Sequence, residues 1–367
     1  MNNSIDQNHL ISFKLIKWYT ANHRKLPWRE TTDAYKIWLS EIILQQTRVD
    51  QGLAYYLKFV AEYPQVEDLA QASEEEVLKN WQGLGYYSRA RNLHATAKKI
   101  VNEYDGKFPT TFTELKKLKG VGDYTAAAVA SFAFDQPAAV VDGNVYRLLA
   151  RIFGIYTPIN TPKAKKEFSR IAQTLMPTDQ AAIFNQAVME LGALVCTPKK
   201  PKCESCPVNE HCFAFEKNKA AELPVKKASI KQKKRFFHYL IIEDQKHLLI
   251  KKRDQKGIWQ NLYDFPLIES TAPKSTEELI KSKALKELLK QKSFTVEAVS
   301  EERKHILSHQ IIYSRFYHLK IERLDEIQPL KFKQITKPSL KQFPIPILLE
   351  KYLKEETNLL SLPEAKS

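Results

Sequence analysis

The sequence predicts a chain of two domains of different class, an all-α domain followed by an α+β domain. At 367 residues the chain is longer than most single domains. Up to about residue 194 the apolar residues recur with a helical period, whereas the alternation typical of strands begins at Phe236. All four cysteines and a basic stretch lie between these two regions. We therefore expect domains over residues 1–221 and 236–355, a basic linker over 222–235 and a tail over 356–367.

The composition points to a polyanionic partner. The net charge is +15 and the pI is about 9.4, although basic proteins without such a partner are common. No stretch is apolar for long enough to span a bilayer. The first residues have the pattern of neither a secretory signal peptide nor a transit peptide. We therefore expect a cytoplasmic protein. Nothing in the sequence indicates an obligate dimer, so we expect a monomer.

Helical patterns follow one another through the first domain. One begins at Asp33 and reads DAYKIWLSEIILQQTRV. A glycine turn, GLGYYSRAR, opens another, and its aromatic and arginine residues suit a role against DNA bases. Taken alone this is a weak signal, because tyrosines that only pack are commoner. The other patterns cover residues 10–19, 53–63, 73–81, 163–176 and 179–194.

A short hairpin, LKGVG at residues 118–122, separates two helical patterns. Gly120 and Gly122 permit positive φ and let the backbone approach a ligand closely. The helix expected from about Asp123 would direct its free N–H groups outward, which suits a phosphate. Hairpins of this kind also occur in many proteins that bind no DNA.

Two carboxylates have environments that should separate their pKa values. Asp142 precedes an apolar helical run, so we expect an N-cap with a lowered pKa. Glu41 falls within the apolar stripe formed by Ile37, Trp38 and Leu44, and burial there would raise its pKa. The alternatives are that Asp142 is only a helix cap, and that Glu41 pairs with an arginine, such as Arg24 or Arg29.

The four cysteines read Cys196-x6-Cys203-x2-Cys206-x5-Cys212, which indicates a metal or cluster site and not a disulfide framework. Structural zinc remains the alternative, although its ligands usually come as two close pairs. Lysines between the first two cysteines would give this loop a basic surface towards phosphates.

The second domain reads as strands at 236–242, 247–251 and 311–320, with one helix at 276–291. This order, with GIWQNLYDFP after the second strand, resembles the Nudix fold. A Nudix hydrolase needs helical glutamates that hold magnesium. The corresponding helix carries Glu287 among lysines, so we expect this module to bind a base or DNA without hydrolysing nucleotides.

Together these features resemble a known family. The hairpin and the Asp142 loop resemble the helix-hairpin-helix DNA glycosylases, and the cysteine spacing resembles the four-iron, four-sulfur loop of endonuclease III. The segment SEIILQQTRV, with Glu41, Gln45, Gln46 and Arg48, and the degenerate Nudix-like domain resemble the adenine DNA glycosylases of the MutY type. The family's fold is an all-α helix-hairpin-helix domain with a [4Fe–4S] loop, followed by an α+β Nudix-like domain.

The resemblance implies a monofunctional enzyme of base excision repair that removes adenine mispaired with 8-oxoguanine or guanine in double-stranded DNA, at the nucleoid. It gives Glu41 the role of general acid and Asp142 that of stabilising the sugar cation. Tyr124 and Asn144 match residues that hold these carboxylates and the water. The cluster would be bound by Cys196, Cys203, Cys206 and Cys212.

The resemblance also assigns residues that contact the bases and the strand. The departure from the family is Leu307, where known members carry an aromatic residue, so stacking on 8-oxoguanine is in doubt. The adenine pocket would comprise Arg24, Leu26, Trp28, Arg29 and Gln186. DNA would be contacted by Gln46, Arg48, Tyr86, Gly120, Gly122, Ser308 and His309.

Three other functions compete with this one. A bifunctional endonuclease III-like glycosylase and lyase needs a Schiff-base lysine, and Tyr124 occupies that position. An iron–sulfur DNA-binding protein without catalysis would not need both Glu41 and Asp142. A Nudix-type nucleotide hydrolase is disfavoured by the lysine-rich helix.

Overall fold

A computed structural model of the chain describes residues 2–228, 232–324, 327 and 332–360. The chain divides into two compact units, Met1–Gln71 with Asn92–Ala228 and Ala72–Arg91 with Ser229–Ser367. Residues 229–231 of the expected linker and 361–367 of the expected tail lie outside the described residues. Among those that are described, no helix is both long and apolar enough to cross a membrane.

The first unit is helical, as the sequence predicts. No strand is present among its described residues. Its longer helices are α1 (Asn2–Asn22), α2 (Ala34–Leu44), α3 (Val49–Glu62), α6 (Ser88–Tyr104, which begins in the other unit), α8 (Asp123–Phe134), α9 (Gly143–Phe153), α10 (Pro162–Leu175) and α11 (Ala181–Leu194). The short ones are η1 (Pro27–Arg29), α4 (Val66–Gln71), α7 (Phe112–Leu115), η2 (Asn209–His211) and α12 (Phe213–Glu216).

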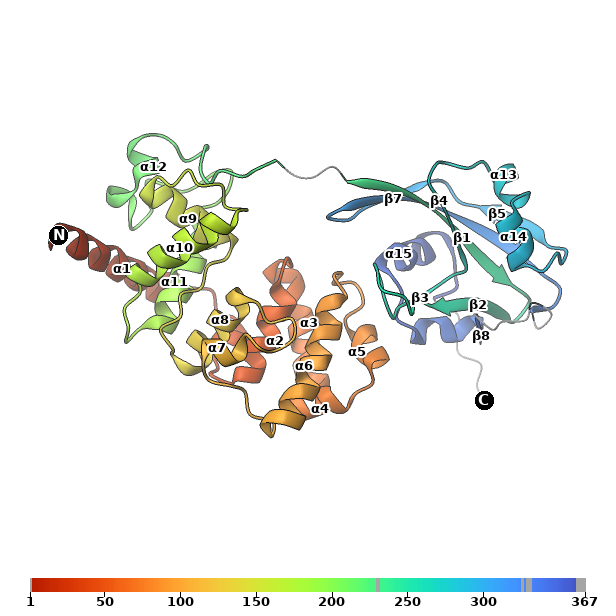
Figure 1. Cartoon of the computed structure of the whole chain (residues 1–367), viewed down its shortest axis with the longest axis horizontal. Helices are drawn as coiled ribbons and strands as arrows, with labels where there is room; N and C mark the ends of the chain where they lie inside the picture. Colours follow the sequence, from red (N-terminus) through yellow and green to blue (C-terminus); the bar gives the residue numbers. More distant parts are fainter. Residues whose placement is uncertain (1, 229–231, 325–326, 328–331, 361–367) are drawn as a thin grey trace. The chain divides into compact units, whose positions relative to one another are not determined.

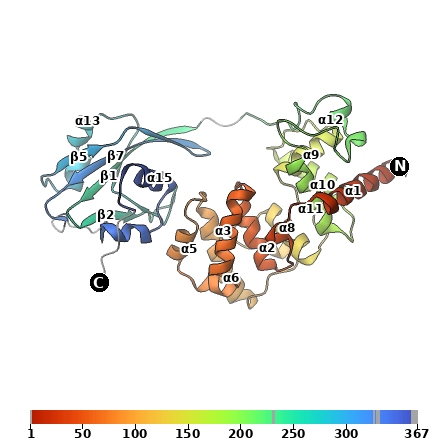
Figure 2. The same cartoon turned by 180° about the vertical axis from the view of Figure 1, so that it is seen from behind.

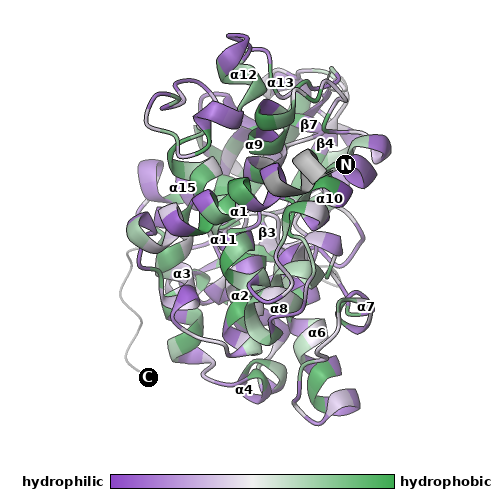
Figure 3. Cartoon of the chain, turned by 90° about the vertical axis from the view of Figure 1, so that its left-hand side faces the viewer, coloured by the Kyte–Doolittle hydropathy of each residue, from purple (hydrophilic) through white to green (hydrophobic). Residues whose placement is uncertain are grey.

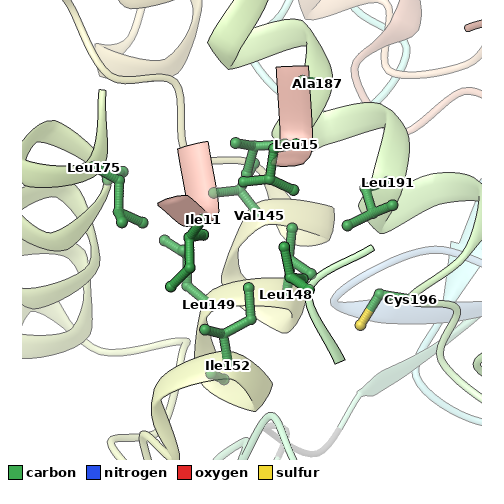
Figure 4. Packing of buried hydrophobic residues seen from close by; sticks show 14 of the residues in the cluster. Ile11, Leu15, Val145, Leu148, Leu149, Ile152, Leu175, Ala187, Leu191 and Cys196 are labelled. Carbon is green, nitrogen blue, oxygen red and sulfur yellow. The ribbon is translucent and has the colours of Figure 1, made fainter. Parts of the chain in front are cut away.

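One core of the first unit forms where α1, α9, α10 and α11 meet. Helix α1 lies beside α10 and α11 in both Figure 1 and Figure 2. Figure 4 shows Leu15 of α1, Leu148 of α9 and Leu191 of α11 directed at one another, with Cys196 at the edge of the same cluster. This core fixes α9, which begins at the Asp142 cap, next to the cysteine loop.

Helix α2 packs against α8, and this contact places the middle of α2 beside the helix that follows the hairpin. Both α2 and α11 are drawn largely in the hydrophobic colour in Figure 3, as interior helices should be. Helix α2 ends at Leu44, earlier than predicted from SEIILQQTRV, and Gln46 has a φ of 55°. Gln45, Gln46 and Arg48 therefore lie beyond the helix, because a left-handed residue cannot continue it.

The second unit contains a sheet in the order β3-β2-β1-β7-β5, with β4 on β1, β6 on β7 and β8 on β2. Strand β1 runs parallel to β7, and the other pairs are antiparallel. The strands are β1 (Lys233–Glu243), β2 (His247–Lys252), β3 (Tyr263–Asp264), β4 (Leu267–Ser270), β5 (Thr295–Val299), β6 (Arg303–Ile306), β7 (Gln310–Lys320) and β8 (Lys333–Thr336). The helices are α5 (Glu74–Asn80), α13 (Thr276–Ile280), α14 (Lys283–Leu288), η4 (Lys337–Gln342) and α15 (Ile347–Glu356).

The two faces of this sheet are covered by different helices. Leu240 of β1 and Tyr317 of β7 pack with Leu285 of α14 on one face. Phe316, the residue before Tyr317 in β7, points to the opposite face and stacks on Tyr352 of α15 with ring centroids 3.7 Å apart. The α+β class is as predicted.

The single helix predicted over residues 276–291 is wrong, because the structure has two. Ser282 ends α13 and caps α14: its hydroxyl donates to the carbonyl of Leu279 at 2.6 Å and accepts the N–H of Leu285 at 3.3 Å. Local serine bonds of this kind compete with a continuous helix.

Residues 72–91 belong to the second unit although they precede most of the first in sequence. Lys79 donates to the carbonyl of Phe343 at 3.1 Å, and Tyr87 donates to that of Ile345 at 3.4 Å. Arg91 donates to the carbonyl of Gln260 at 2.9 Å. These bonds join α5 and the GLGYYSRAR turn to the remainder of the second unit.

Candidate active site

Glu41, Tyr124 and Asp142 line one cleft of about 1260 Å³ in the first unit. Hairpin residues Gly120 and Gly122 line it as well. The two carboxylates that the sequence singled out therefore share a cavity large enough for a nucleobase.

Glu41 is held inside the apolar surface of α2, where its residue exposure is 6%. The Tyr124 hydroxyl donates to its Oε2 at 2.6 Å. Burial raises the pKa of Glu41 to about 7, and the negative charge of Asp142 adds to this, whereas the Tyr124 bond and Arg29 act in the opposite direction. Glu41 thus carries a proton in a substantial fraction of molecules at neutral pH.

Asp142 is the N-cap of α9, as predicted. Its Oδ1 accepts the N–H groups of Asn144 and Val145, both at 2.8 Å, and its Oδ2 accepts the Asn144 side-chain amide at 2.8 Å. The prediction of a lowered pKa was nevertheless wrong. Burial raises the pKa of Asp142 by more than these hydrogen bonds lower it.

The two acids still differ in how well their anions are stabilised. Asp142 accepts three hydrogen bonds, whereas one is found on the side chain of Glu41. Because each such bond favours the ionised form, a proton shared by the pair resides on Glu41 in preference to Asp142.

Arg147 continues the network behind Asp142, and sequence reasoning missed it. Its guanidinium donates to Asn144 Oδ1 at 2.9 Å, to the carbonyl of Gly192 at 2.6 Å and to the carbonyl of Cys196 at 2.6 Å. The arginine is buried, with 8% exposure, on the mainly apolar inner face of α9, which also carries the buried Arg151. An arginine on an apolar helix face was the signal that could have identified it.

Two of the predicted adenine-pocket residues contact a third acid, Glu190, which the sequence analysis also missed. Arg24 and Arg29 pair with Glu190 of α11, with N–O distances of 2.6 and 2.7 Å. Burial alone would raise the pKa of Glu190, but hydrogen bonds from both arginines lower it to about 2. The ion pairs found for these arginines therefore go to Glu190, although the charge of Arg29 still acts on Glu41.

Gln186, one turn before Glu190, accepts the hydroxyl of Tyr19. Leu26 and Trp28 are buried, and Trp28 packs edge-on against Tyr56. The described residues that line the cleft of Glu41 and Asp142 include none of the five predicted pocket residues.

The four cysteines line a single cavity, together with the apolar side chains of Leu148, Ile152 and Val208. Arg151 donates to Cys196 Sγ at 3.3 Å, which places a cation beside the thiols. In the described chain, no three His, Cys, Asp or Glu side chains are grouped to hold one metal ion. Four thiols around one apolar cavity suit an iron–sulfur cluster, whose ligands are cysteine thiolates.

The hairpin glycines differ in what they do. Gly120 has a φ of +76°, and a Cβ there would lie 2.7 Å from Asn92 Cβ, so glycine is required. Gly122 does not use the positive φ that glycine permits, because its φ is −89°. A Cβ on Gly122 would meet nothing within 4 Å, so the cleft surface is open where α8 begins.

The other predicted DNA contacts are exposed. Gln46 and Arg48 lie in the turn before α3. Within the second unit, the hydroxyls of Tyr86 and Ser308 are 3.0 Å apart, and Tyr86 is 49% exposed. His309 is exposed beside Ser308, while Leu307 is half-buried.

The sequence matches three families. Residues 39–174 match HhH-GPD superfamily base excision DNA repair protein, and residues 196–212 match the iron–sulfur binding domain of endonuclease III. Residues 238–355 match the NUDIX domain. The predicted cluster and the predicted Nudix-like fold are thereby confirmed.

Comparison with individual proteins points the same way. An adenine DNA glycosylase of Buchnera aphidicola subsp. Schizaphis graminum is 38% identical over 75% of this chain and 79% of its own length. The human adenine DNA glycosylase is 43% identical over 57% of this chain and 40% of its own length. The structure of a thermostable thymine-DNA glycosylase has a TM-score of 0.54 at 33% identity, covering 58% of this chain and 98% of that one.

Proposed function

This chain belongs to the adenine DNA glycosylases, which act in base excision repair, and we propose that it removes adenine paired with 8-oxoguanine or guanine. The observation that carries the proposal is the shared cleft of Glu41 and Asp142. Hydrolysis of a glycosidic bond calls for one protonated acid and one anion near the same sugar.

Glu41 is the proposed general acid. Its pKa of about 7 lets it deliver a proton to the adenine ring at neutral pH, so that the base departs as a neutral molecule. Tyr124 orients it by donating to Oε2 at 2.6 Å. Burial raises the pKa of Tyr124 well above its usual value, so the hydroxyl keeps the proton it donates.

Asp142 is the proposed stabiliser of the positive charge that develops on the deoxyribose when the bond breaks. Its three hydrogen bonds, two of them from Asn144, fix both oxygens. Arg147 holds Asn144 in turn. An anion in a partly dry site stabilises a cation more strongly than it would in water.

Tyr124 also supports monofunctional chemistry. It occupies the position at which a lyase in this superfamily carries its Schiff-base lysine, and a phenol cannot form an imine with the sugar. We therefore propose that the product is an intact strand with an abasic site.

The thiols of Cys196, Cys203, Cys206 and Cys212 would hold the [4Fe–4S] cluster. When bound, the cluster supplies a rigid cross-link of its loop and takes no part in hydrolysis. Arg147, which donates to the carbonyl of Cys196 and to Asn144, would tie that rigidity to the Asp142 cap.

The remaining assignments rest on the family resemblance, on chemistry and on exposure. The family resemblance alone assigns Arg24, Leu26, Trp28, Arg29 and Gln186 to the adenine pocket, since both arginines pair with Glu190 and none of the five is among the described residues that line the cleft. Gln46, Arg48 and Tyr86 would contact the distorted duplex, where an extruded base leaves a gap. Ser308 and His309 would read 8-oxoguanine by hydrogen bonds, without the stacking that Leu307 cannot supply.

We also propose that the protein acts as a monomer on chromosomal DNA, at the nucleoid. The domain boundaries at 221, 236 and 355 remain part of the proposal.

The test is a single-turnover assay on a duplex with one adenine:8-oxoguanine pair, analysed with and without alkali. We expect strand breaks after alkali treatment and an intact strand without it. Breaks without alkali would indicate lyase chemistry. No breaks in either case would contradict the proposed substrate.

A further inference from the structure

A carboxylate lies where the cleft should receive a phosphate. Asp123 is the first residue of α8, so it sits at the positive end of the helix beside the open surface at Gly122. Its side chain is 30% exposed and lines the same cleft as Glu41 and Asp142. Because DNA presents a phosphate at every nucleotide, a fixed negative charge at this rim would repel the substrate.

Two lysines from separate elements meet on this carboxylate. Lys116, which follows α7, lies 2.8 Å from Oδ1, and Lys165 of α10 contacts Oδ2. Each lysine thus pairs with one carboxylate oxygen. Two lysines could pair in the same way with the two non-bridging oxygens of a phosphodiester. Hydrogen bonds from both lysines lower the pKa of Asp123, so the group they hold is an anion.

The remainder of the rim is basic. Lys166, next to Lys165 on α10, also lines the cleft. The other two acids that line it, Glu41 and Asp142, are occupied by Tyr124 and by the α9 cap. Among the described residues that line the cleft, Asp123 is therefore the acid whose carboxylate pairs with the rim lysines.

The ion pairs are of a kind that exchanges readily. The lysine side chains are 52% and 59% exposed, and exposed pairs contribute little to stability because water screens them. A DNA phosphate would meet the same two cations and release condensed counterions, which favours the exchange.

We propose that Asp123 is a stand-in for a phosphate of the target strand, holding Lys116 and Lys165 in place until a phosphodiester of bound DNA displaces it. The proposal rests on the DNA-glycosylase function stated above. In the free protein the carboxylate keeps the lysines ordered and weakens their attraction for other anions. In the complex the lysines pair with the phosphate beside the extruded nucleotide, and Asp123 turns to solvent.

The test is binding of the cluster-loaded full chain to a duplex with a 2′-fluoro-2′-deoxyadenosine opposite 8-oxoguanine, since the fluorine slows loss of the base. Dissociation constants are measured over a series of potassium chloride concentrations for Asp123→Asn, Lys116→Met, Lys165→Met and the combined variants. Asp123→Asn should bind about threefold more tightly, because no carboxylate competes with the phosphate.

Each lysine variant should lower the slope of log affinity against log salt by about one. Removing both lysines should abolish the gain from Asp123→Asn. The matched controls are Glu114→Gln and Lys117→Met, an exposed pair 2.6 Å apart that does not line the cleft. These controls should change affinity and slope by less than the cleft variants.

Weaker binding by Asp123→Asn, or a gain no larger than that of Glu114→Gln, would overturn the proposal and leave Asp123 as a helix-stabilising residue. Thermal melting separates such a result from misfolding, and the lysine variants test the same site without altering the helix N-terminus. Excision from the same duplex without fluorine is measured separately, so a failure of catalysis would contradict the proposed function and not the phosphate exchange.

Discussion

The cleft of Glu41 and Asp142, where we propose catalysis, and the proposed lesion-reading loop are built in opposite ways. In the cleft, Glu41 and Asp142 come from packed helices, and their oxygens accept hydrogen bonds from neighbours that are themselves fixed. In the loop, Ser308 and His309 are exposed at the turn between β6 and β7. Proton transfer and charge stabilisation need groups fixed in position, whereas inspection of a base can be done by side chains that water also reaches. Changes in the cleft should therefore alter rate, and changes in the loop should alter preference.

Asp142→Asn is the sharpest way to test this contrast. It removes the anion while leaving a polar side chain of the same size at the cap, so excision should fall by at least about a thousandfold. Binding to duplex DNA should remain largely intact, because the hairpin is unchanged. Single-turnover rates and dissociation constants check both expectations, and an equal loss of binding and rate would contradict the assigned role.

Glu41→Gln should lower excision at neutral pH by about a hundredfold or more, since an amide cannot deliver the proton. With Glu41 present, the rate should fall as pH rises through the Glu41 pKa of about 7, because the protonated form is the acid. It should also fall in acid as Asp142, whose pKa burial raises, loses its negative charge. A pH profile of single-turnover rates for both proteins measures this. A profile of Glu41→Gln that retains the same alkaline fall would assign it to another group.

The same substitution should stabilise the fold. Because the folded-state pKa of Glu41 is raised, its favourable contribution is complete below the unfolded pKa of 4.5 and is lost as pH rises through about 7. Glu41→Gln removes this buried charge, so it should melt several degrees higher than the parent at alkaline pH. The difference should shrink towards pH 5. Equal melting temperatures at both pH values would indicate that the cleft is wetter than its burial implies.

Substitutions in the loop should change the preference between the two mispairs and leave the excision rate nearly unchanged. Replacing Ser308 and His309 by alanine should reduce the preference for 8-oxoguanine over guanine opposite adenine by about tenfold, which corresponds to one or two hydrogen bonds. Excision of adenine opposite guanine serves as the control and should change little. An unchanged preference would remove the loop from lesion reading.

Leu307→Phe gives the smallest expected effect. An aromatic ring at the half-buried Leu307 position would add stacking on the lesion, and preference for 8-oxoguanine should rise about threefold. Competition between the two duplexes in one reaction measures it, with Ile306→Phe as a matched control at the exposed neighbour.

The sequence predicted correctly those features that depend on neighbouring residues in the chain. The N-cap at Asp142 and the buried glutamate at Glu41 follow from helical spacing alone, and both occur in the structure. The pKa of Asp142 did not follow, because its desolvation depends on helices far away in sequence. Glu190 was missed for a similar reason: its partners, Arg24 and Arg29, lie more than 160 residues earlier.

Secondary structure shows the same division. The Ser282 break and the end of α2 at Leu44 depend on single hydrogen bonds or single dihedrals, which a periodic pattern does not record. Strands β4, β6 and β8 were not predicted, because each is only four residues long. Strands β4 and β8 also pair with strands distant in sequence.

The assignment of residues 72–91 to the second unit bears on how the protein can be dissected. A chain cut at the basic stretch after residue 221 would retain Lys79, Tyr87 and Arg91 but lose the carbonyl groups of Phe343, Ile345 and Gln260 that accept their hydrogen bonds. In such a fragment, residues 72–91 would lack these hydrogen-bond partners and face water. A loss of activity caused by their misfolding could be mistaken for loss of lesion recognition. Point substitutions therefore separate the roles of the two units better than truncation does. A stable fragment would need residues 72–91 redesigned as a solvent-exposed surface.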